Sequence, residues 1–388
     1  MNPMTLFEMP VMDGRRTTLQ SVSEAWNACH LPLVNLTTGH WGAAGYTDDV
    51  GLYYFVPLLS RWVGIAIDPA INLFLWALIF LGASVAAVFF FKMYPGRLAR
   101  WVVGAGLTCL ALQAWRAGDV YVTLMALTSI FAPYFLWTHR RAESESIWDP
   151  WMFALLGLLA GYGNLIRSQS GNGVLILMFV GLAVHPRFKP SRKTLLLGLT
   201  LVALAVPSLH FKHLERQRDA FLVSQDPTYQ PKTVRHPFWH NVYIGFGYLQ
   251  PNPYGITYSD TVASDKVKSV DPQIGFVTKE YEAVLKDETL KLVRHDPWFT
   301  LKTLAAKSAK LFLYLLVYAN LGWLYVWKRK LSWRIWLPLL LAAGFFTLPG
   351  LLVMPGKAYV LGMISLAALF GIDQVCWRTE QGPGWKPV

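Results

Sequence analysis

The sequence predicts an all-α polytopic membrane protein with about nine transmembrane helices and an extracytoplasmic subdomain. The chain has 388 residues, of which 54% are hydrophobic and 15% are charged, whereas soluble proteins carry about 25% charged residues. Its apolar stretches reach or approach the roughly 20 residues that a helix needs to cross the hydrocarbon core. The loops between these stretches alternate between basic and not basic, a pattern that assigns an orientation in the membrane.

From the N-terminus, the expected elements alternate between spanning and external segments. Residues 1–69 precede the first long apolar stretch and form an extracytoplasmic segment; six spans follow within 70–211. An extracytoplasmic loop subdomain is expected at 212–302, three more spans within 303–377 and a cytoplasmic tail at 378–388. The apolar stretches are 70–91, 99–116, 119–138, 150–166, 172–186, 194–211, 303–327, 334–353 and 357–377. The short pair at 150–166 and 172–186 could instead be re-entrant or thin the bilayer locally.

Lys and Arg near the ends of the spans fix the orientation. One set of loops and the tail hold 15 of them, and the opposite short loops hold only Arg116, Arg167 and Lys357. The basic loops are therefore assigned to the cytoplasm, which suggests a bacterial inner membrane with the interesting polar residues outside. The net charge of +12 follows largely from this topology, so no nucleic-acid partner is needed to explain it. The external loop is neutral, since residues 212–298 hold 11 basic and 11 acidic side chains.

The external N-terminal segment lacks the apolar region of a signal peptide within its first thirty residues. The interpretation favoured here is a preceding transmembrane helix that is missing from this chain; translocation of an uncleaved tail is the alternative. Cys29, Cys109 and Cys376 lie at different membrane depths, so no disulfide framework is expected.

Two adjacent acids, Asp48 and Asp49, stand out in the external segment. The stretch 45–62 predicts a short amphipathic helix at the membrane interface, with Thr47 as N-cap and both carboxylates in the first turn. They could simply complement the helix dipole, which is worth about 0.3–1 kcal/mol each. Alternatively, one carboxylate could act as a general base toward an acceptor hydroxyl while the other positions it.

An external loop with paired acids, followed by an interfacial helix and many spans, resembles the GT-C superfamily of membrane glycosyltransferases. The resemblance implies a polyprenyl-phosphate-linked sugar donor, an extracytoplasmic glycan, lipid or protein acceptor, and transfer of a hexose or pentose with inversion. It implies that Asp48 and Asp49 are the catalytic residues. The motif Arg116-Ala-Gly-Asp119-Val-Tyr121 is similar to a second external turn where the family often places another acid.

Two later stretches are also similar to bacterial members of this superfamily. Residues 286–311 resemble an amphipathic helix with Pro, aromatic and Lys residues that opens a late span. Residues 354–359 resemble a basic-plus-tyrosine element, here Lys357 and Tyr359, that opens the last span. The resemblance therefore covers the architecture of nearly the whole chain.

A lipid-phosphate donor needs cations at the outer leaflet, and Arg116, Arg167 and Lys357 are the candidates. The fork of hydrogen-bond donors on an arginine suits phosphate better than a lysine does. Each of the three could instead snorkel to the lipid headgroups.

The densest aromatic and polar cluster of the external loop is 235–248. We expect Trp239 and His240 to contact donor or acceptor, although such aromatics also suit an interfacial belt. His236 and His240 have the i, i+4 spacing of a metal pair, but Pro237 and the missing third ligand argue against one. Whether a divalent cation binds the paired acids stays open.

Two other classes of membrane protein are alternatives to the glycosyltransferase. A transporter should place ionisable groups near the bilayer midplane, and the span interiors are almost free of them. A polysaccharide ligase or polymerase also has a large external loop, and only the aspartate pair before the first span separates it from the favoured interpretation.

Overall fold

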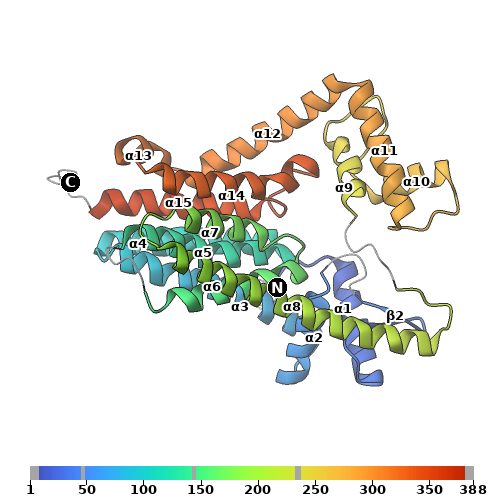
Figure 1. Ribbon diagram of the computed structural model, residues 1–388. Coiled ribbons are helices and arrows are strands. Elements are labelled where there is room, and N and C mark those ends of the chain that lie inside the picture. The colour runs from blue at the N-terminus through green and yellow to red at the C-terminus, as the bar shows by residue number, and fades with distance from the viewer. Residues whose placement is uncertain (1–7, 45–48, 142–145, 232–236, 381–388) are drawn as a thin grey trace, which may run out of the picture.

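The computed structural model describes residues 8–44, 49–141, 146–231 and 237–380. Figure 1 shows a bundle of long helices, with an outer layer of shorter elements at one of its ends. The C-terminus lies at the opposite end of the bundle.

The bundle contains a helix at the position of every predicted span. Its members are α3 (Ile67–Met93), α4 (Arg97–Ala117), α5 (Val122–Arg140), α6 (Asp149–Ile166), α7 (Asn172–Val184), α8 (Pro190–Gln225), α12 (Pro297–Ala319), α13 (Gly322–Arg329), α14 (Trp333–Leu352) and α15 (Leu361–Glu380). Within the described residues, five helices are long and apolar enough to cross a membrane: 67–93, 97–117, 119–140, 190–225 and 333–352. The chain is thus an all-α polytopic membrane protein, and the number nine remains a prediction.

Helix α5 forms the centre of the bundle, and 94% of its most apolar window is buried. It packs against α3, α4, α6, α7 and α15. A helix that is apolar on all sides is expected to be enclosed by others. Small residues allow the close approach: a Cβ on Gly82 of α3 would lie only 2.9 Å from the Cα of Ala126.

Two helices differ from the expected spans. The span expected at 303–327 is divided, because Asn320 has a φ of +42° and ends α12 before α13 begins. Helix α12 starts earlier than expected: Asp296 caps it by accepting the Phe299 N–H at 2.9 Å, and proline suits its first turn. Helix α8 continues to Gln225, so residues 212–225 prolong a helix instead of opening a loop.

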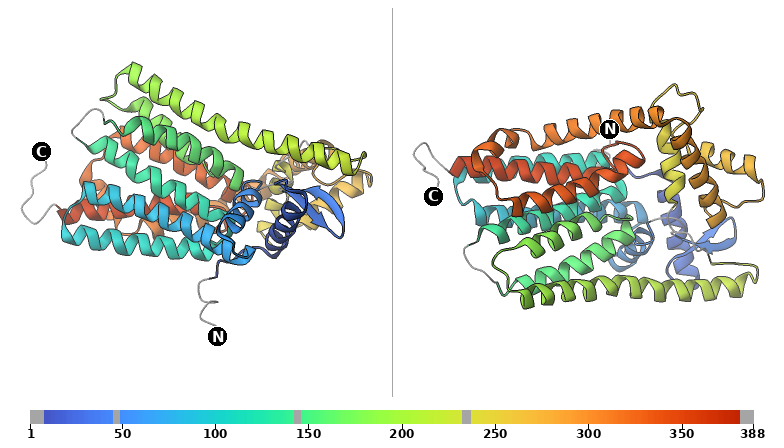
Figure 2. Two further views of the ribbon diagram at one scale, coloured as in Figure 1. Left: turned by 90° about the horizontal axis from the view of Figure 1, so that it is seen from below. Right: turned by 45° about the horizontal axis from the view of Figure 1, so that its top comes forward.

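The outer layer has two parts, which are visible on the right of Figure 1. The N-terminal part contains α1 (Asp13–Cys29), the antiparallel strands β1 (Val34–Thr37) and β2 (His40–Ala43), and α2 (Leu52–Val63). The second part contains α9 (Phe238–Gly245), η3 (Phe246–Tyr248), α10 (Asp260–Val270) and α11 (Lys279–His295), with an apolar core of its own. The long α8 reaches from the bundle to the hairpin, as both views of Figure 2 show. The right view also shows that α12 connects the bundle to α11.

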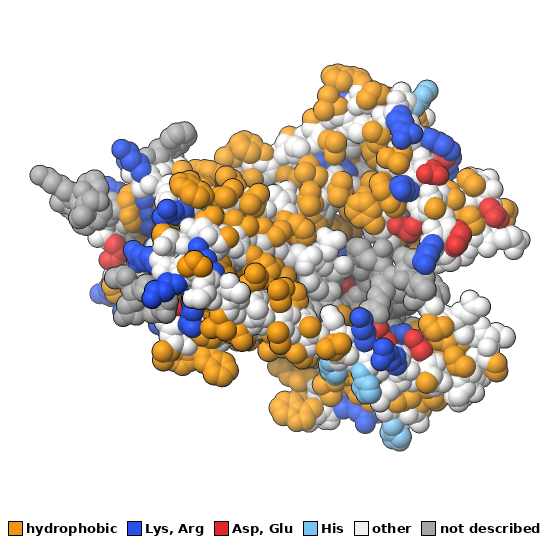
Figure 3. Space-filling view, viewed as in Figure 1, with side chains coloured by type: hydrophobic (Ala, Val, Ile, Leu, Met, Phe, Trp, Pro, Cys, Tyr) orange, Lys and Arg blue, Asp and Glu red, His pale blue; other side chains and the backbone are white. Residues whose placement is uncertain are grey.

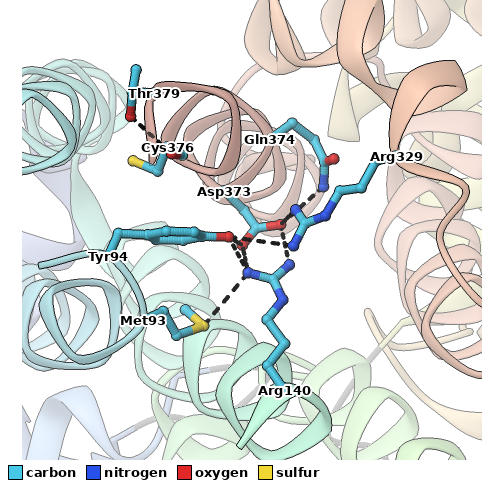
Figure 4. A network of polar contacts seen from close by, with 8 residues as sticks. All are labelled: Met93, Tyr94, Arg140, Arg329, Asp373, Gln374, Cys376 and Thr379. Atoms are coloured by element: carbon cyan, nitrogen blue, oxygen red, sulfur yellow. Dashed lines mark hydrogen bonds and ion pairs between the residues drawn. The ribbon is translucent and has the colours of Figure 1, made fainter. Parts of the chain in front are cut away.

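The charges follow the polarity expected from the sequence. In Figure 3, Lys and Arg side chains gather at the bundle end near the C-terminus, an apolar belt follows, and the outer layer shows both signs. At the basic end, Asp373 of α15 is fully buried and pairs with Arg140 and Arg329, while Tyr94 donates a hydrogen bond to it at 2.8 Å (Figure 4).

Candidate functional site

Two acids predicted from separate loops meet where the N-terminal part of the outer layer joins the bundle. Asp49 precedes α2, and Asp119 begins the short η2 helix (Asp119–Tyr121) between α4 and α5. Both contact one guanidinium, that of Arg15 on α1. Arg15 Nε donates to Asp49 Oδ2 at 2.7 Å, and Arg15 Nη1 lies 2.5 Å from Asp119 Oδ2. The carboxylates are 2% and 6% exposed, so this is a buried acidic pair with a shared cation.

Both acids are held in an uncommon backbone conformation. The φ of Asp49 is +64° and that of Asp119 is +55°. Non-glycine residues rarely adopt positive φ, and such strain is found preferentially at functional sites. The expectation that both carboxylates occupy the first turn of a helix from Thr47 was wrong for Asp49, because α2 begins only at Leu52. Asp48 and Thr47 lie outside the described residues.

The loop after Asp49 is fixed to the end of α6. Gly51 donates its N–H to the carbonyl of Leu165 at 2.7 Å. A Cβ at Gly51 would lie 2.9 Å from the backbone nitrogen of Ile166, so only glycine allows this approach. Since Arg167 follows directly, the docking brings the loop that carries Asp49 to the arginine predicted to bind phosphate.

Arg167 lies between the acids and a set of tyrosines. Its Nη1 is 3.8 Å from Asp49 Oδ1. Its guanidinium lies over the ring of Tyr121, 4.8 Å from the centroid, and 6.0 Å from that of Tyr359. The Tyr359 hydroxyl forms a 2.6 Å hydrogen bond with the hydroxyl of Tyr258. Cation–π contacts of this kind hold a guanidinium in place.

A cavity of about 400 Å³ opens beside Arg167. This volume is within the range of small-molecule sites. Its polar lining comes from Tyr121, Arg167–Gln169, Asn241 and Tyr359, and its apolar wall comes from α5, α9 and α14: Leu124, Phe238, Val242, Phe345, Phe346, Leu348, Pro349, Leu352 and Val353. A cavity with one cationic end and long apolar walls suits a ligand with an anionic head and a hydrocarbon chain.

The remaining predicted residues are placed differently. Arg116 and Lys357 are exposed, and Lys357 Nζ donates to Gln113 Oε1 at 3.4 Å. Their binding roles stay predictions.

Trp239 and His240 do not line this cavity, although their neighbours Phe238, Asn241 and Val242 do. His240 is buried in the outer layer, with its ring nitrogens 2.8 Å from the Tyr281 hydroxyl and 3.0 Å from Asp260 Oδ1. Its predicted contact with substrate has no support in this geometry and remains a prediction, as does that of Trp239.

No group of three or more His, Cys, Asp or Glu side chains that could hold a metal ion occurs within the described ranges. His236 and Asp48, which figured in the metal alternatives, lie outside those ranges. The question of a divalent cation at the paired acids therefore stays open.

Sequence reasoning missed Arg15, the residue that joins the two acids. It lies in the stretch Asp13-Gly14-Arg15-Arg16, which is typical of a solvated helix start. Its partners are 34 and 104 positions away in the chain. No local pattern signals such a contact. The aromatic side chain of Phe346 was likewise interpreted only as part of a span.

Comparisons with known proteins give few matches. No family model matches the chain, and no curated protein matches it. Among solved structures, the chain is similar to ArnT from Cupriavidus metallidurans. The ArnT structure bound to undecaprenyl phosphate gives a TM-score of 0.44 at 14% identity, over 98% of this chain and 76% of ArnT. The apo ArnT structure gives 0.40 at 13% identity, over 93% and 72%. Both TM-scores lie below 0.5, so the likeness to ArnT is one of overall arrangement at low similarity.

Proposed function

We propose that this protein is a membrane glycosyltransferase of the GT-C type. It transfers a sugar from a polyprenyl-phosphate donor to an acceptor on the extracytoplasmic side of a bacterial inner membrane. The observation that carries the proposal is that Arg167 lies 3.8 Å from Asp49 of the acidic pair and also lines the mainly apolar cavity.

The cavity supports the choice of donor. Its wall of α14 side chains suits the first units of a prenyl chain, which gains about 25 cal/mol for each Å² of apolar surface removed from water. Arg167 at the polar end suits the phosphate, because guanidinium and phosphate form charge-assisted bidentate hydrogen bonds. In this arrangement the sugar lies between the phosphate and Asp49.

The proposed reaction is one in-line displacement. Asp49 accepts the proton of an acceptor hydroxyl as its oxygen attacks the anomeric carbon. The bond between that carbon and the phosphate oxygen breaks with inversion, and the bonding electrons leave with the polyprenyl phosphate. Arg167 stabilises the charge that develops on the departing phosphate. Asp119 positions the acceptor or the base, and Asp48 is the alternative base.

The test is sugar transfer from a mixed pool of labelled polyprenyl-phosphate sugars, using membranes that carry the wild type, Asp48→Asn, Asp49→Asn or Asp119→Asn. Asp13→Asn, an exposed acid of α1, is the matched control. We expect transfer by the wild type and the control, and a fall of about 10²- to 10⁴-fold in Asp49→Asn at equal expression. Equal transfer by all variants would remove these acids from the reaction, and a wild type inactive with every donor would contradict the proposal.

A further inference from the structure

The acidic pair needs an explanation of how two carboxylates from different loops stay together. Asp49 and Asp119 both contact Arg15 through Oδ2, so their negative charges are separated by no more than one guanidinium group. Two like charges so close, and shielded from water, repel strongly at the reduced dielectric of a partly buried site. The backbone strain at both residues adds to the cost of this arrangement.

Arg15 is built to offset that repulsion. Its side chain is only 14% exposed, and it directs Nε and Nη2 to Asp49 and Nη1 to Asp119. Burial disfavours its charge, but the neighbouring Asp49 and Asp119 outweigh this effect and raise the pKa of the guanidinium above its ordinary value. An arginine is suited to such a bridge because its planar fork presents separate donors on fixed vectors, which a lysine ammonium does not.

Helix α1 is itself held against the second external loop. The N–H of Met12, just before α1, is 3.4 Å from Asp119 Oδ2. The indole N–H of Trp115 at the end of α4 donates to the carbonyl of Glu8 at 3.2 Å. Further along the side that carries Arg15, α1 buries Leu19, Val22 and Ala25. The start of α1 is therefore anchored where Arg15 must act.

We propose that Arg15 is a positioning residue that joins Asp49 and Asp119 into one acidic site, so that the external helix α1 is part of the site. The catalytic consequence of this inference rests on the proposed function, whereas the pairing of Arg15 with the two acids does not. Arg15 supplies the positive charge between the carboxylates and keeps them adjacent. The base can then accept a proton beside the lipid-phosphate cavity.

The pairing is tested by a double-mutant cycle on the unfolding temperature of the purified protein. In the wild type, Asp119→Asn should lower that temperature, because it removes an attractive partner of Arg15. In an Arg15→Ala background, the same change should raise it or leave it unchanged, because only repulsion between the acids is then relieved. Arg16→Ala is the matched control background, since Arg16 pairs instead with Glu8 at 2.8 Å and Asp68 at 3.2 Å. Destabilisation by Asp119→Asn in all three backgrounds would overturn the proposal.

Sugar transfer gives the second readout. We expect Arg15→Ala to lower the rate by about 10- to 100-fold, the scale of losing hydrogen bonds to charged groups. Arg15→Lys should restore part of the rate, and guanidinium at non-denaturing concentration should increase transfer by Arg15→Ala alone. Transfer by Arg15→Ala equal to that of Arg16→Ala would overturn the role of Arg15. Absence of transfer by the wild type would instead contradict the proposed function alone. The pairing would still be tested, because the opposite effects of Asp119→Asn on the unfolding temperature in the two backgrounds require no turnover.

Discussion

At the scale of single residues, Arg167 connects the two halves of the proposed site. Its side chain is 15% exposed and lies 3.8 Å from Asp49 on one side and over the Tyr121 ring on the other. An arginine that only snorkelled to the headgroups would have no need of such partners. The stacked ring and the acid hold the guanidinium beside the cavity, where a phosphate would meet it already oriented.

We therefore expect Arg167→Gln to weaken use of the donor, with a fall in kcat/KM of about 10- to 100-fold that lies mostly in KM for the lipid-linked sugar. Steady-state kinetics with varied donor concentration measure the effect. Arg61→Gln is the control, because Arg61 is exposed in the last turn of α2 and does not line the cavity. Equal effects of the two changes would indicate that Arg167 binds no phosphate.

At the scale of elements, Lys307 determines how α14 ends beside the cavity. Its side chain is buried, and Nζ donates to the carbonyls of Leu351 at 3.0 Å and Val353 at 2.9 Å. These are among the last carbonyls of α14, which have no partners within the helix. A cation is also favoured at this end of a helix dipole. Leu352 and Val353 line the cavity, so Lys307 fixes part of its wall.

Replacing Lys307 by Met should leave these partly buried carbonyls without the lysine donor, at a cost of about 1–3 kcal/mol. We expect a lower unfolding temperature together with weaker binding of polyprenyl phosphate, measured by native mass spectrometry. Lys302→Met, at an exposed position of the same helix, should change neither. If Lys307→Met binds the lipid phosphate as well as the wild type does, the end of α14 does not depend on this lysine.

The other end of the bundle is held by the Asp373 cluster (Figure 4). Arg140 comes from α5, Arg329 from α13 and Tyr94 follows α3, so one carboxylate fixes three elements to α15. Breaking a buried ion pair typically costs about 3–5 kcal/mol, because the remaining charge loses its partner. This cluster explains how the short α13 is retained after the break at Asn320.

Asp373→Asn should therefore lower the unfolding temperature of the purified protein markedly, while Glu380→Gln lowers it little. Glu380 is the matched control because it is exposed on the same helix. Thermal unfolding of both variants in one detergent measures the difference. Similar temperatures for the two variants would show that the cluster contributes little to stability.

At the scale of the whole molecule, the uneven distribution of Lys and Arg predicts the side of the membrane on which the outer layer lies. Ser269 on α10 and Ser191 at the start of α8 are both exposed and occupy opposite ends of the fold. In a variant without its three native cysteines, Ser269→Cys should react with a membrane-impermeant maleimide in intact cells. Ser191→Cys should react only after permeabilisation. The reverse pattern would overturn the assigned orientation.

Much of the fold could be predicted from the sequence because each apolar stretch carries its own signal. The break at Asn320 and the continuation of α8 past residue 211 could not. The chain is apolar on both sides of Asn320, and it becomes polar at Lys212 although the helix continues, so hydropathy marks neither event. Of the site, Asp119 and Arg167 were singled out from local motifs and do come together with Asp49. Arg15 was missed because its role exists only through contacts between distant segments.

The account as a whole depends on chemistry at the anomeric carbon beside Asp49. The most direct measurement follows one labelled polyprenyl-phosphate sugar with purified protein in lipid nanodiscs. It quantifies donor binding, glycosylated acceptor and free polyprenyl phosphate for the wild type and Asp49→Asn. The account predicts that the wild type forms the two products in equal amounts. Asp49→Asn should still bind the donor but form both products at least about 100-fold more slowly. An intact donor with the wild type, or equal rates for both proteins, would contradict it.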